Sequence, residues 1–321
     1  RAPFESILSH GFVVDGKGLK MSKSLGNVIA PEDILKKYGA DILRIWVAAS
    51  NYAEDLRIDY SILDQHSESY RKIRNTFRYL LGNVNDKFED VNLDKINIKS
   101  LPELERFMLN KIYLLNEKFE TCFQKYDFHN LYKELLNFCT VDLSAFYFDI
   151  RKDTLYCDPI NSEKRKSCVM ILNILLKSLL RWFAPILSFT TEEIYQLISK
   201  NNKSIHLEKF LKFPEKFKDE RLAVKWSELI KIRDVCNISI EEKRASKEIG
   251  SSLEAELNIK LNEKYKDMIT NIDLSELCIV SKIHVYFDET SDILVETKKA
   301  SGDKCPVCWK ISVEPCERHS Q

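Results

Sequence analysis

The sequence predicts a mainly α-helical protein that ends in a small α+β unit. Apolar residues recur at helical spacing over most of residues 62–200, whereas alternating apolar and polar runs appear only in the C-terminal third. With 321 residues, 44% of them hydrophobic, the chain can bury a sizeable core and form two or three domains. We therefore expect a globular protein of several domains.

The overall charge excludes a generally basic nucleic-acid-binding protein. Lysine plus arginine and aspartate plus glutamate both number 49, so any nucleic-acid contact must come from local basic faces. The nine cysteines do not resemble a dense disulfide framework, which favours a reducing, cytoplasmic setting. No apolar run reaches the roughly 18 residues of a membrane span, and no signal peptide is recognisable. The chain starts at Arg1 without an initiator methionine, so we expect a fragment of a longer protein.

A β-hairpin is predicted over residues 12–20, because Asp15-Gly16 supplies the positive φ angles of a tight turn. The segment Lys20-Met21-Ser22-Lys23-Ser24 follows directly and is called the phosphate loop below. Lysine ammonium groups can offset charge on a leaving pyrophosphate, serine hydroxyls can donate to its oxygens, and nearby glycines let a loop close. The alternative is a solvated basic turn, since lysine and serine are common in loops. The candidates for binding a polyphosphate such as that of a nucleotide are Lys20, Ser22, Lys23 and Ser24.

Two short helices are predicted between residues 31 and 49. Proline is favoured at the first helical position and glycine just after the last, so Pro31 and Gly39 should bracket the first helix. Ala30 is a poor cap for it. The second helix, residues 40–49, should bury Ile42, Ile45 and Trp46.

A helical bundle should follow. Its predicted helices start near Ile62 and continue over residues 101–124, 129–150 and 163–200. Ala184-Pro185 should interrupt the last of these, and Thr190 with Glu193 would then form a capping box.

Charged residues on the bundle helices give two further predictions. Arg71, Arg74 and Arg78 lie at i, i+3 and i+7, a spacing that can follow a phosphate backbone, so we predict that they bind RNA. Charges within residues 149–153 are expected to form local ion pairs at a helix end rather than RNA contacts.

The C-terminal third combines one helix with three strands. A helix is predicted over residues 223–246, and alternating runs predict strands at 255–261, 279–287 and 293–297.

Cysteine spacing near the C-terminus predicts a structural zinc site. Two pairs, each with two residues between its members, can surround a tetrahedral ion; the ligands would be Cys305, Cys308, Cys316 and His319. A single such pair could instead be a redox pair or two unrelated thiols. The six other cysteines are expected to be buried apolar residues. Trp309 either stacks on an unpaired RNA base or packs on the metal module.

Several motifs occur in the order typical of class I aminoacyl-tRNA synthetases for large aliphatic amino acids. They are His10-Gly11-Phe12, Asp15-Gly16, the phosphate loop, Leu25-Gly26-Asn27 and Gly39-Ala40-Asp41. The chain resembles the C-terminal part of bacterial-type isoleucyl-tRNA synthetases. The preference over valyl and leucyl relatives rests on residues 46–50 with Tyr52 and Asp55, on residues 70–76, and on the terminal cysteine cluster.

The resemblance implies a ligase that activates isoleucine with ATP and Mg²⁺ and transfers it to tRNA(Ile). In this family the loop stabilises the adenylation transition state, which makes Lys23, supported by Lys20, the catalytic candidate. The class I HxGH motif is absent, because Phe12 follows His10-Gly11. We therefore expect the nucleotide fold, the amino-acid pocket and any editing domain upstream, and an inactive fragment in isolation.

The resemblance also implies four regions in a monomeric, cytoplasmic enzyme. Residues 1–60 would end the catalytic domain, 61–215 form the anticodon-binding bundle, 216–300 the α+β domain and 301–321 the zinc-binding tail. Relatives usually carry four cysteines in the tail, whereas this chain has His319 in the last place. In relatives the tryptophan after the second cysteine contacts the anticodon end of tRNA, which assigns Trp309 the same role.

Two other functions remain open at this stage. The bundle and tail could be a tRNA-binding module without catalysis, or the tail could make the chain a structural zinc protein. Activity of the isolated chain, RNA binding and zinc content distinguish these two functions from each other and from the ligase function.

Overall fold

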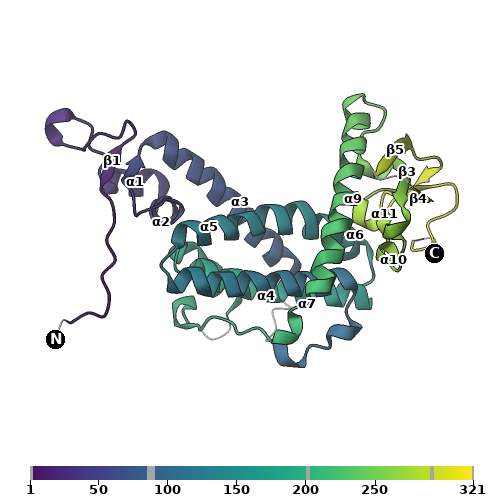
Figure 1. The fold of residues 1–321 in the computed structure, drawn as a ribbon, viewed down its shortest axis with the longest axis horizontal. Helices are drawn as coiled ribbons and strands as arrows, with labels where there is room; N and C mark the ends of the chain where they lie inside the picture. Colours follow the sequence, from purple (N-terminus) through teal and green to yellow (C-terminus); the bar gives the residue numbers. More distant parts are fainter. Residues whose placement is uncertain (1–2, 85–90, 200–202, 290–292, 320–321) are drawn as a thin grey trace. The chain divides into compact units, whose positions relative to one another are not determined.

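The computed structural model describes residues 3–84, 91–199, 203–289 and 293–319. Two compact units emerge, each built from separate stretches of the chain (Figure 1). Unit 1 comprises Arg1–Ile98, Lys111–Phe146 and Val169–Phe217, and unit 2 comprises Lys99–Asn110, Tyr147–Cys168 and Lys218–Gln321. Most described residues are helical, which confirms the predicted mainly α class.

Unit 1 opens with strand β1 (Val13–Asp15), which pairs in parallel with β2 (Leu56–Ile58). The predicted hairpin is reduced to a single antiparallel bridge between Val14 and Lys20. The positive φ lies at Gly18 (81°), so its placement at Asp15-Gly16 was wrong. The reason is that the Asp15 carboxylate accepts hydrogen bonds from the backbone amides of Lys17 (3.0 Å) and Leu19 (2.8 Å). The turn therefore extends over several residues.

Helices α1 (Pro31–Tyr38) and α2 (Ala40–Ala49) have the predicted bounds. Gly39 ends α1, and Ala30 provides no side-chain cap, both as expected. Ile42, Ile45 and Trp46 are buried, which confirms the predicted inner face of α2.

Five long or medium helices and one π-helical segment make up the bundle region. These are α3 (Tyr60–Val84), α4 (Glu103–Gln124), α5 (Phe128–Asn137), the π segment Phe138–Tyr147, α6 (Phe148–Cys157) and α7 (Glu163–Phe183), followed by α8 (Ser188–Ile198). The interruption at Ala184-Pro185 is confirmed. In unit 1 the core includes Phe77 and Phe183, whose ring centroids lie 6.0 Å apart edge to face.

The predicted capping box at Thr190 and Glu193 was wrong. Thr190 lies inside α8, and the cap residue Leu187 forms no side-chain cap bond. Instead, Asp41 of α2 accepts the backbone N–H of Thr190 at 2.8 Å and that of Phe189 at 3.3 Å. A carboxylate from a distant helix therefore replaces the local cap.

Unit 2 carries helix α9 (Glu220–Ala245) and a three-stranded sheet of order β4-β3-β5. Strand β3 (Ala255–Asn262) runs parallel to β4 (Lys282–Asp288) and antiparallel to β5 (Leu294–Lys299). The predicted helix and strands are confirmed, except that β4 starts later than expected because α11 (Leu274–Cys278) precedes it. The remaining short elements are α10 (Lys266–Ile269), β6 (Asp303–Lys304) and β7 (Ile311–Ser312), with 3-10 turns at Lys23–Leu25, Leu93–Lys95, Ile98–Ser100, Ile205–Leu207, Glu215–Phe217, Ser252–Glu254 and Glu263–Tyr265.

A buried ion network lies in unit 2. Arg151 is 2% exposed and binds both carboxylate oxygens of Glu105, at 2.7 and 2.6 Å, and one of Glu276 at 2.7 Å. The expectation of local ion pairs is correct for Lys152 and Asp149 (2.9 Å) but wrong for Arg151, whose partners are distant in sequence. Burial explains the difference, because a desolvated guanidinium must be fully paired.

Candidate phosphate loop, RNA surfaces and metal centre

The phosphate loop is held by a short turn of helix. Ser22 begins it by accepting the amide of Leu25 at 3.3 Å, and the hydroxyls of Ser22 and Ser24 lie 3.1 Å apart. Gly26 ends it with a φ of 67°, a left-handed conformation that glycine adopts without steric cost. These hydrogen bonds and the turn at Gly26 define the loop backbone.

Asn27 ties this loop to the preceding turn. Its side-chain oxygen accepts the amide of Ser22 at 2.9 Å, and its nitrogen donates to Asp15 at 2.9 Å and to the carbonyl of Lys20 at 3.3 Å. The hydrogen bond from Asn27, followed by the amide of Leu19, lowers the pKa of Asp15 below its usual value. Sequence reasoning missed this positioning role, since only the motif around Asn27 was recognised.

The lysines of the loop project into solvent. Lys20 and Lys23 are both exposed, and within the described part of the chain neither ammonium group is paired with a carboxylate. Ser22 and Met21 are half-buried and Ser24 is exposed. The structure thus gathers all four candidate ATP-binding residues on one small loop and leaves the two cations available.

The predicted arginine stripe lies on α3. Arg71, Arg74 and Arg78 are all exposed, at the helical spacing that puts them on neighbouring turns. Arg71 pairs with Glu68 at 2.5 Å, and Arg74 donates to the Tyr70 hydroxyl at 3.2 Å. These contacts orient two of the guanidinium groups but leave their charge at the surface.

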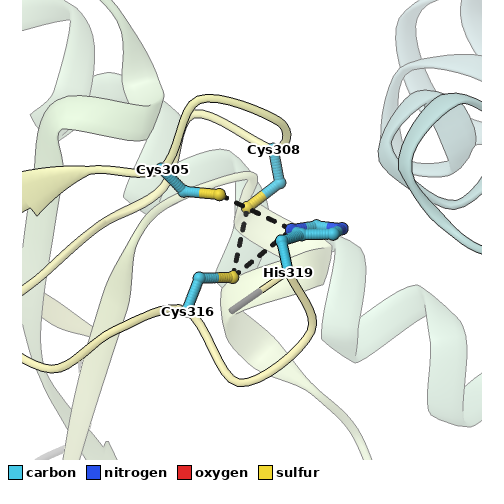
Figure 2. A group of neighbouring side chains, drawn as sticks. All are labelled: Cys305, Cys308, Cys316 and His319. Atoms are coloured by element: carbon cyan, nitrogen blue, oxygen red, sulfur yellow. Dashed lines mark hydrogen bonds between the residues drawn. The ribbon is translucent and has the colours of Figure 1, made fainter. Parts of the chain in front are cut away.

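The four predicted metal ligands converge at one point, although they come from two separate turns (Figure 2). Cys308 Sγ lies 3.8 Å from Cys316 Sγ, and His319 Nδ1 lies 3.5 Å from Cys305 Sγ and 3.4 Å from Cys316 Sγ. All four donor atoms fall within 4.8 Å of one another. A tetrahedron with metal–sulfur bonds of about 2.3 Å has edges of about 3.8 Å, so the donor set fits a zinc-sized ion.

A two-stranded ribbon supports the first ligand pair. Strands β6 and β7 pair antiparallel, and Cys305 exchanges backbone hydrogen bonds with the turn: its amide donates to Lys310 at 2.9 Å and its carbonyl accepts from Trp309 at 3.0 Å. Gly302 (φ 118°) precedes β6, and a Cβ there would lie 2.1 Å from the carbonyl of Ser312. Only glycine permits this approach of the two strands.

The thiols of the first pair differ in acidity. The amide of Cys308, followed by that of Val307, lowers the pKa of Cys305 to about 6, whereas burial raises the pKa of Cys308 to about 12. A bound cation would lower the pKa of both thiols and hold them as thiolates.

A cavity of about 320 Å³ lies beside the ligand cluster in unit 2. Trp309 stands at its edge, 58% exposed and with a φ of 65°, a conformation that costs free energy for a residue other than glycine. Lys304 Nζ lies 5.1 Å from the centroid of the indole. Tyr156 of α6 is 64% exposed. The wall includes Tyr156, Leu253, Ile279, Val307, Trp309 and Lys310. Sequence reasoning suggested an RNA contact for Trp309 and Lys310 but not for the other four.

The remaining cysteines are largely as expected. Cys122, Cys139, Cys168, Cys236 and Cys278 are buried, while Cys157 is only half-buried, which corrects that one expectation. Cys157 ends α6, beside the metal-binding tail. Among the described residues no helix is both long and apolar enough to cross a bilayer.

Two family profiles match the chain in succession. The profile "tRNA synthetases class I (I, L, M and V)" matches residues 1–59, and "Anticodon-binding domain of tRNA ligase" matches residues 105–259. An isoleucine–tRNA ligase of Pelagibacter ubique is 71% identical over 320 residues, which cover 100% of this chain and 35% of that protein. The chain is similar along its whole length to class I isoleucine–tRNA ligases. It corresponds to their C-terminal portion, which confirms the resemblance inferred from the motifs.

Other isoleucine–tRNA ligases are similar along nearly the whole chain. That of Geobacter sulfurreducens is 39% identical over 98% of this chain and 35% of its own length. The chain therefore spans about a third of these curated relatives. A LeuRS-tRNA-LeuAMS ternary complex from Agrobacterium radiobacter K84 superposes with a TM-score of 0.51 at 15% identity, over 87% of this chain and 32% of that one. At this identity the similarity supports the fold alone.

Proposed function

We propose that this chain supplies two working parts of an isoleucine–tRNA ligase: a loop that assists ATP-dependent activation of isoleucine, and surfaces that bind tRNA(Ile). The two successive family matches, together with 71% identity to one such ligase, carry the proposal. The full reaction forms isoleucyl-adenylate and pyrophosphate, with ATP bound as its Mg²⁺ complex. Transfer of isoleucine to the terminal adenosine of the tRNA follows, in the cytoplasm and by a monomeric enzyme.

In the first step, Lys23 and Lys20 would stabilise negative charge on the departing pyrophosphate. Preorganised cations act most strongly where charge develops, and these two ammonium groups have no described carboxylate partner that would offset them. Ser22 and Ser24 would donate hydrogen bonds to the phosphate oxygens. Asn27 and Asp15 would hold the loop backbone in the shape that presents all four.

The proposed regions are the end of the catalytic domain over 1–60, the anticodon-binding bundle over 61–215, the α+β domain over 216–300 and the zinc-binding tail over 301–321. The bundle and the tail would bind tRNA. Arg71, Arg74 and Arg78 would contact the phosphate backbone. Trp309 would stack on an unpaired base beside the cavity, with Lys304 and Lys310 adding positive charge.

The metal centre would serve this RNA surface structurally. Zinc held by Cys305, Cys308, Cys316 and His319 would fix the two turns of the tail relative to each other. The ribbon of β6 and β7 holds the first ligand pair, and the second ligand of that pair, Cys308, is directly followed by Trp309. Lys310, next to it, provides a cation for the RNA.

Titration of tRNA(Ile) into the chain tests the tRNA-binding role. We expect binding by the chain and a roughly 5- to 150-fold loss in a Trp309→Ala variant, the range of about 1–3 kcal/mol for one stacked base. A Tyr286→Ala variant is the control, since Tyr286 is an exposed aromatic residue on the sheet. Equal losses in both variants, or none, would remove Trp309 from the RNA surface.

Isoleucine-dependent pyrophosphate exchange tests whether the isolated chain can catalyse adenylation. We expect none from the isolated chain, because it spans only about 35% of the relative's length and lacks an HxGH motif. Clear exchange by the isolated chain would contradict the proposal.

A further inference from the structure

The turn that carries Cys316 and His319 has less backbone support than the turn that carries the first ligand pair. Cys305 and Cys308 sit on the ribbon of β6 and β7, while the second pair, within residues 293–319 that the structure describes here, shows one backbone hydrogen bond, from the His319 amide to the Cys316 carbonyl at 3.0 Å. Both residues of the second pair are half-buried. The geometry of the fourth ligand must therefore be fixed from outside the turn.

The C-terminal end of α6 provides that outside support. Arg318, the residue before His319, pairs with Asp153 at 2.5 Å and also with Asp158, which follows the last residue of the helix. The side chain of Asp158 is 14% exposed and that of Asp153 27%, so both carboxylates are partly removed from water. One guanidinium thus joins two carboxylates that would otherwise repel each other.

The imidazole of His319 contacts the same helix end. Its Nε2 lies 3.2 Å from the backbone carbonyl oxygen of Cys157. A carbonyl can only accept, so Nε2 must carry the hydrogen, and in the neutral ring Nδ1 then has the free lone pair. Nδ1 is the atom that faces Cys305 and Cys316. The helix end therefore selects the tautomer that metal binding requires.

We propose that the end of α6 is the outer shell of the metal centre, and that Arg318 is the residue that positions His319 as the fourth ligand. Asp153 and Asp158 anchor Arg318, and the Cys157 carbonyl orients the ring that Arg318 brings into place. The proposal goes beyond tRNA binding and concerns metal affinity, which can be measured without RNA or catalysis. A surface ion pair with no other role would change metal affinity little.

Zinc affinity of the purified full-length protein tests this inference, measured by competition with a chromogenic chelator. We expect Arg318→Met to weaken zinc binding about 10- to 100-fold, as loss of an outer-shell partner does in other sites. Arg318→Lys should recover part of the loss, because it can keep one of the two ion pairs. Arg244→Met is the matched control: Arg244 pairs only locally, with Glu241, in the last turn of α9.

Cobalt substitution gives a second readout. The visible spectrum would stay unchanged in the variant if Arg318 only stabilised the fold. In the wild type, three thiolates and one imidazole should give an intense tetrahedral visible spectrum. The spectrum of Arg318→Met should change toward that of His319→Ala, because the ring no longer stays in place. A wild-type spectrum and a zinc Kd within twofold of wild type for Arg318→Met would overturn the proposal.

Asp153→Asn is a second variant that tests the proposal even if Arg318→Met fails to fold. We expect it to weaken zinc binding severalfold. Its effect should be smaller in the Arg318→Lys background than in the wild type if the two residues act as a unit. Fully additive losses, or an unchanged zinc Kd for Asp153→Asn, would also overturn the proposal.

Discussion

The carboxylate of Asp41 accepts hydrogen bonds from both the backbone N–H and the hydroxyl of Thr190, a residue 149 positions further along the chain. The first N–H groups of a helix have no partner within the helix, and α8 has no side-chain cap of its own. Asp41 is only 7% exposed, so water cannot readily replace these bonds. The Tyr70 hydroxyl lies 2.9 Å from that of Thr190 and extends the network to α3.

Asp41→Ala should therefore destabilise the protein by about 1–3 kcal/mol, the range for losing a cap and leaving buried donors unpaired. Urea unfolding at neutral pH measures the effect. Asp234→Ala, at an exposed position in the middle of α9, should change stability by less than about 0.5 kcal/mol. Equal stability of the two variants would show that the cap is dispensable.

Lys23→Ala in the full-length ligase should slow isoleucine-dependent pyrophosphate exchange roughly 10²- to 10³-fold, comparable to the loss of one transition-state donor. The Kd for tRNA(Ile) should stay unchanged, since the loop acts on ATP. Lys17→Ala removes an exposed lysine of the preceding turn and serves as the control. Comparable slowing by Lys17→Ala would mean that the loop contributes only general positive charge.

Replacing Arg71, Arg74 and Arg78 together by glutamine should weaken tRNA binding and reduce its salt dependence. Each lost phosphate contact should lower the slope of log Kd against log salt by about 1. The matched control replaces Lys260, Lys282 and Lys298, three exposed lysines of the sheet, in the same way. An unchanged slope in the arginine variant would place the RNA elsewhere on the protein.

Elemental analysis should find about one zinc ion per chain, consistent with one four-ligand cluster. Cys316→Ser should abolish stoichiometric zinc, because it removes a donor within 3.8 Å of another thiol. Cys157→Ser should retain it, since only the backbone carbonyl of Cys157 faces His319. Absence of zinc from the wild-type protein would contradict the assignment of this site.

Acid should remove the stabilisation that Glu276 provides. Burial alone would raise its pKa, but Arg151 and then Lys164 hold the pKa below its usual value. A carboxylate with a lowered folded-state pKa stabilises the protein above its ordinary pKa and loses that effect as the pH falls through the folded value. Glu276→Gln should thus cost about 3 kcal/mol at pH 7 and progressively less below about pH 4.

Urea unfolding of Glu276→Gln and wild type across this pH range measures the difference. Glu296→Gln is the control, because Glu296 lies on β5 and its ion pair with Lys298 is exposed. A difference between Glu276→Gln and wild type that stays constant down to pH 3 would show that the charge of Glu276 is irrelevant.

Local signals in the sequence were sufficient for several parts of the fold and site. Pro31 and Gly39 determine the bounds of α1 through constraints on their own φ angles. The spacing of Cys305 and Cys308 likewise puts both donors on one turn.

Features that depend on distant partners could not be predicted in this way. The Asp41 cap and the Arg151 network join residues that are far apart in the chain, and nothing near either residue specifies the partner. For Thr190, the local pattern even suggested a cap that the tertiary structure replaces. The cavity beside Trp309 is a similar case, because Tyr156, Leu253 and Ile279 come from separate elements and carry no common motif.

Gly302 shows that a position without any reactive atom can govern a chemical site. Since a Cβ there would lie 2.1 Å from the Ser312 carbonyl, every other amino acid forces the ribbon under the first ligand pair apart. A random mutational screen for loss of zinc should therefore return Gly302 together with the four ligands. To an observer who sees only the phenotypes, it would look like a fifth member of the coordination sphere.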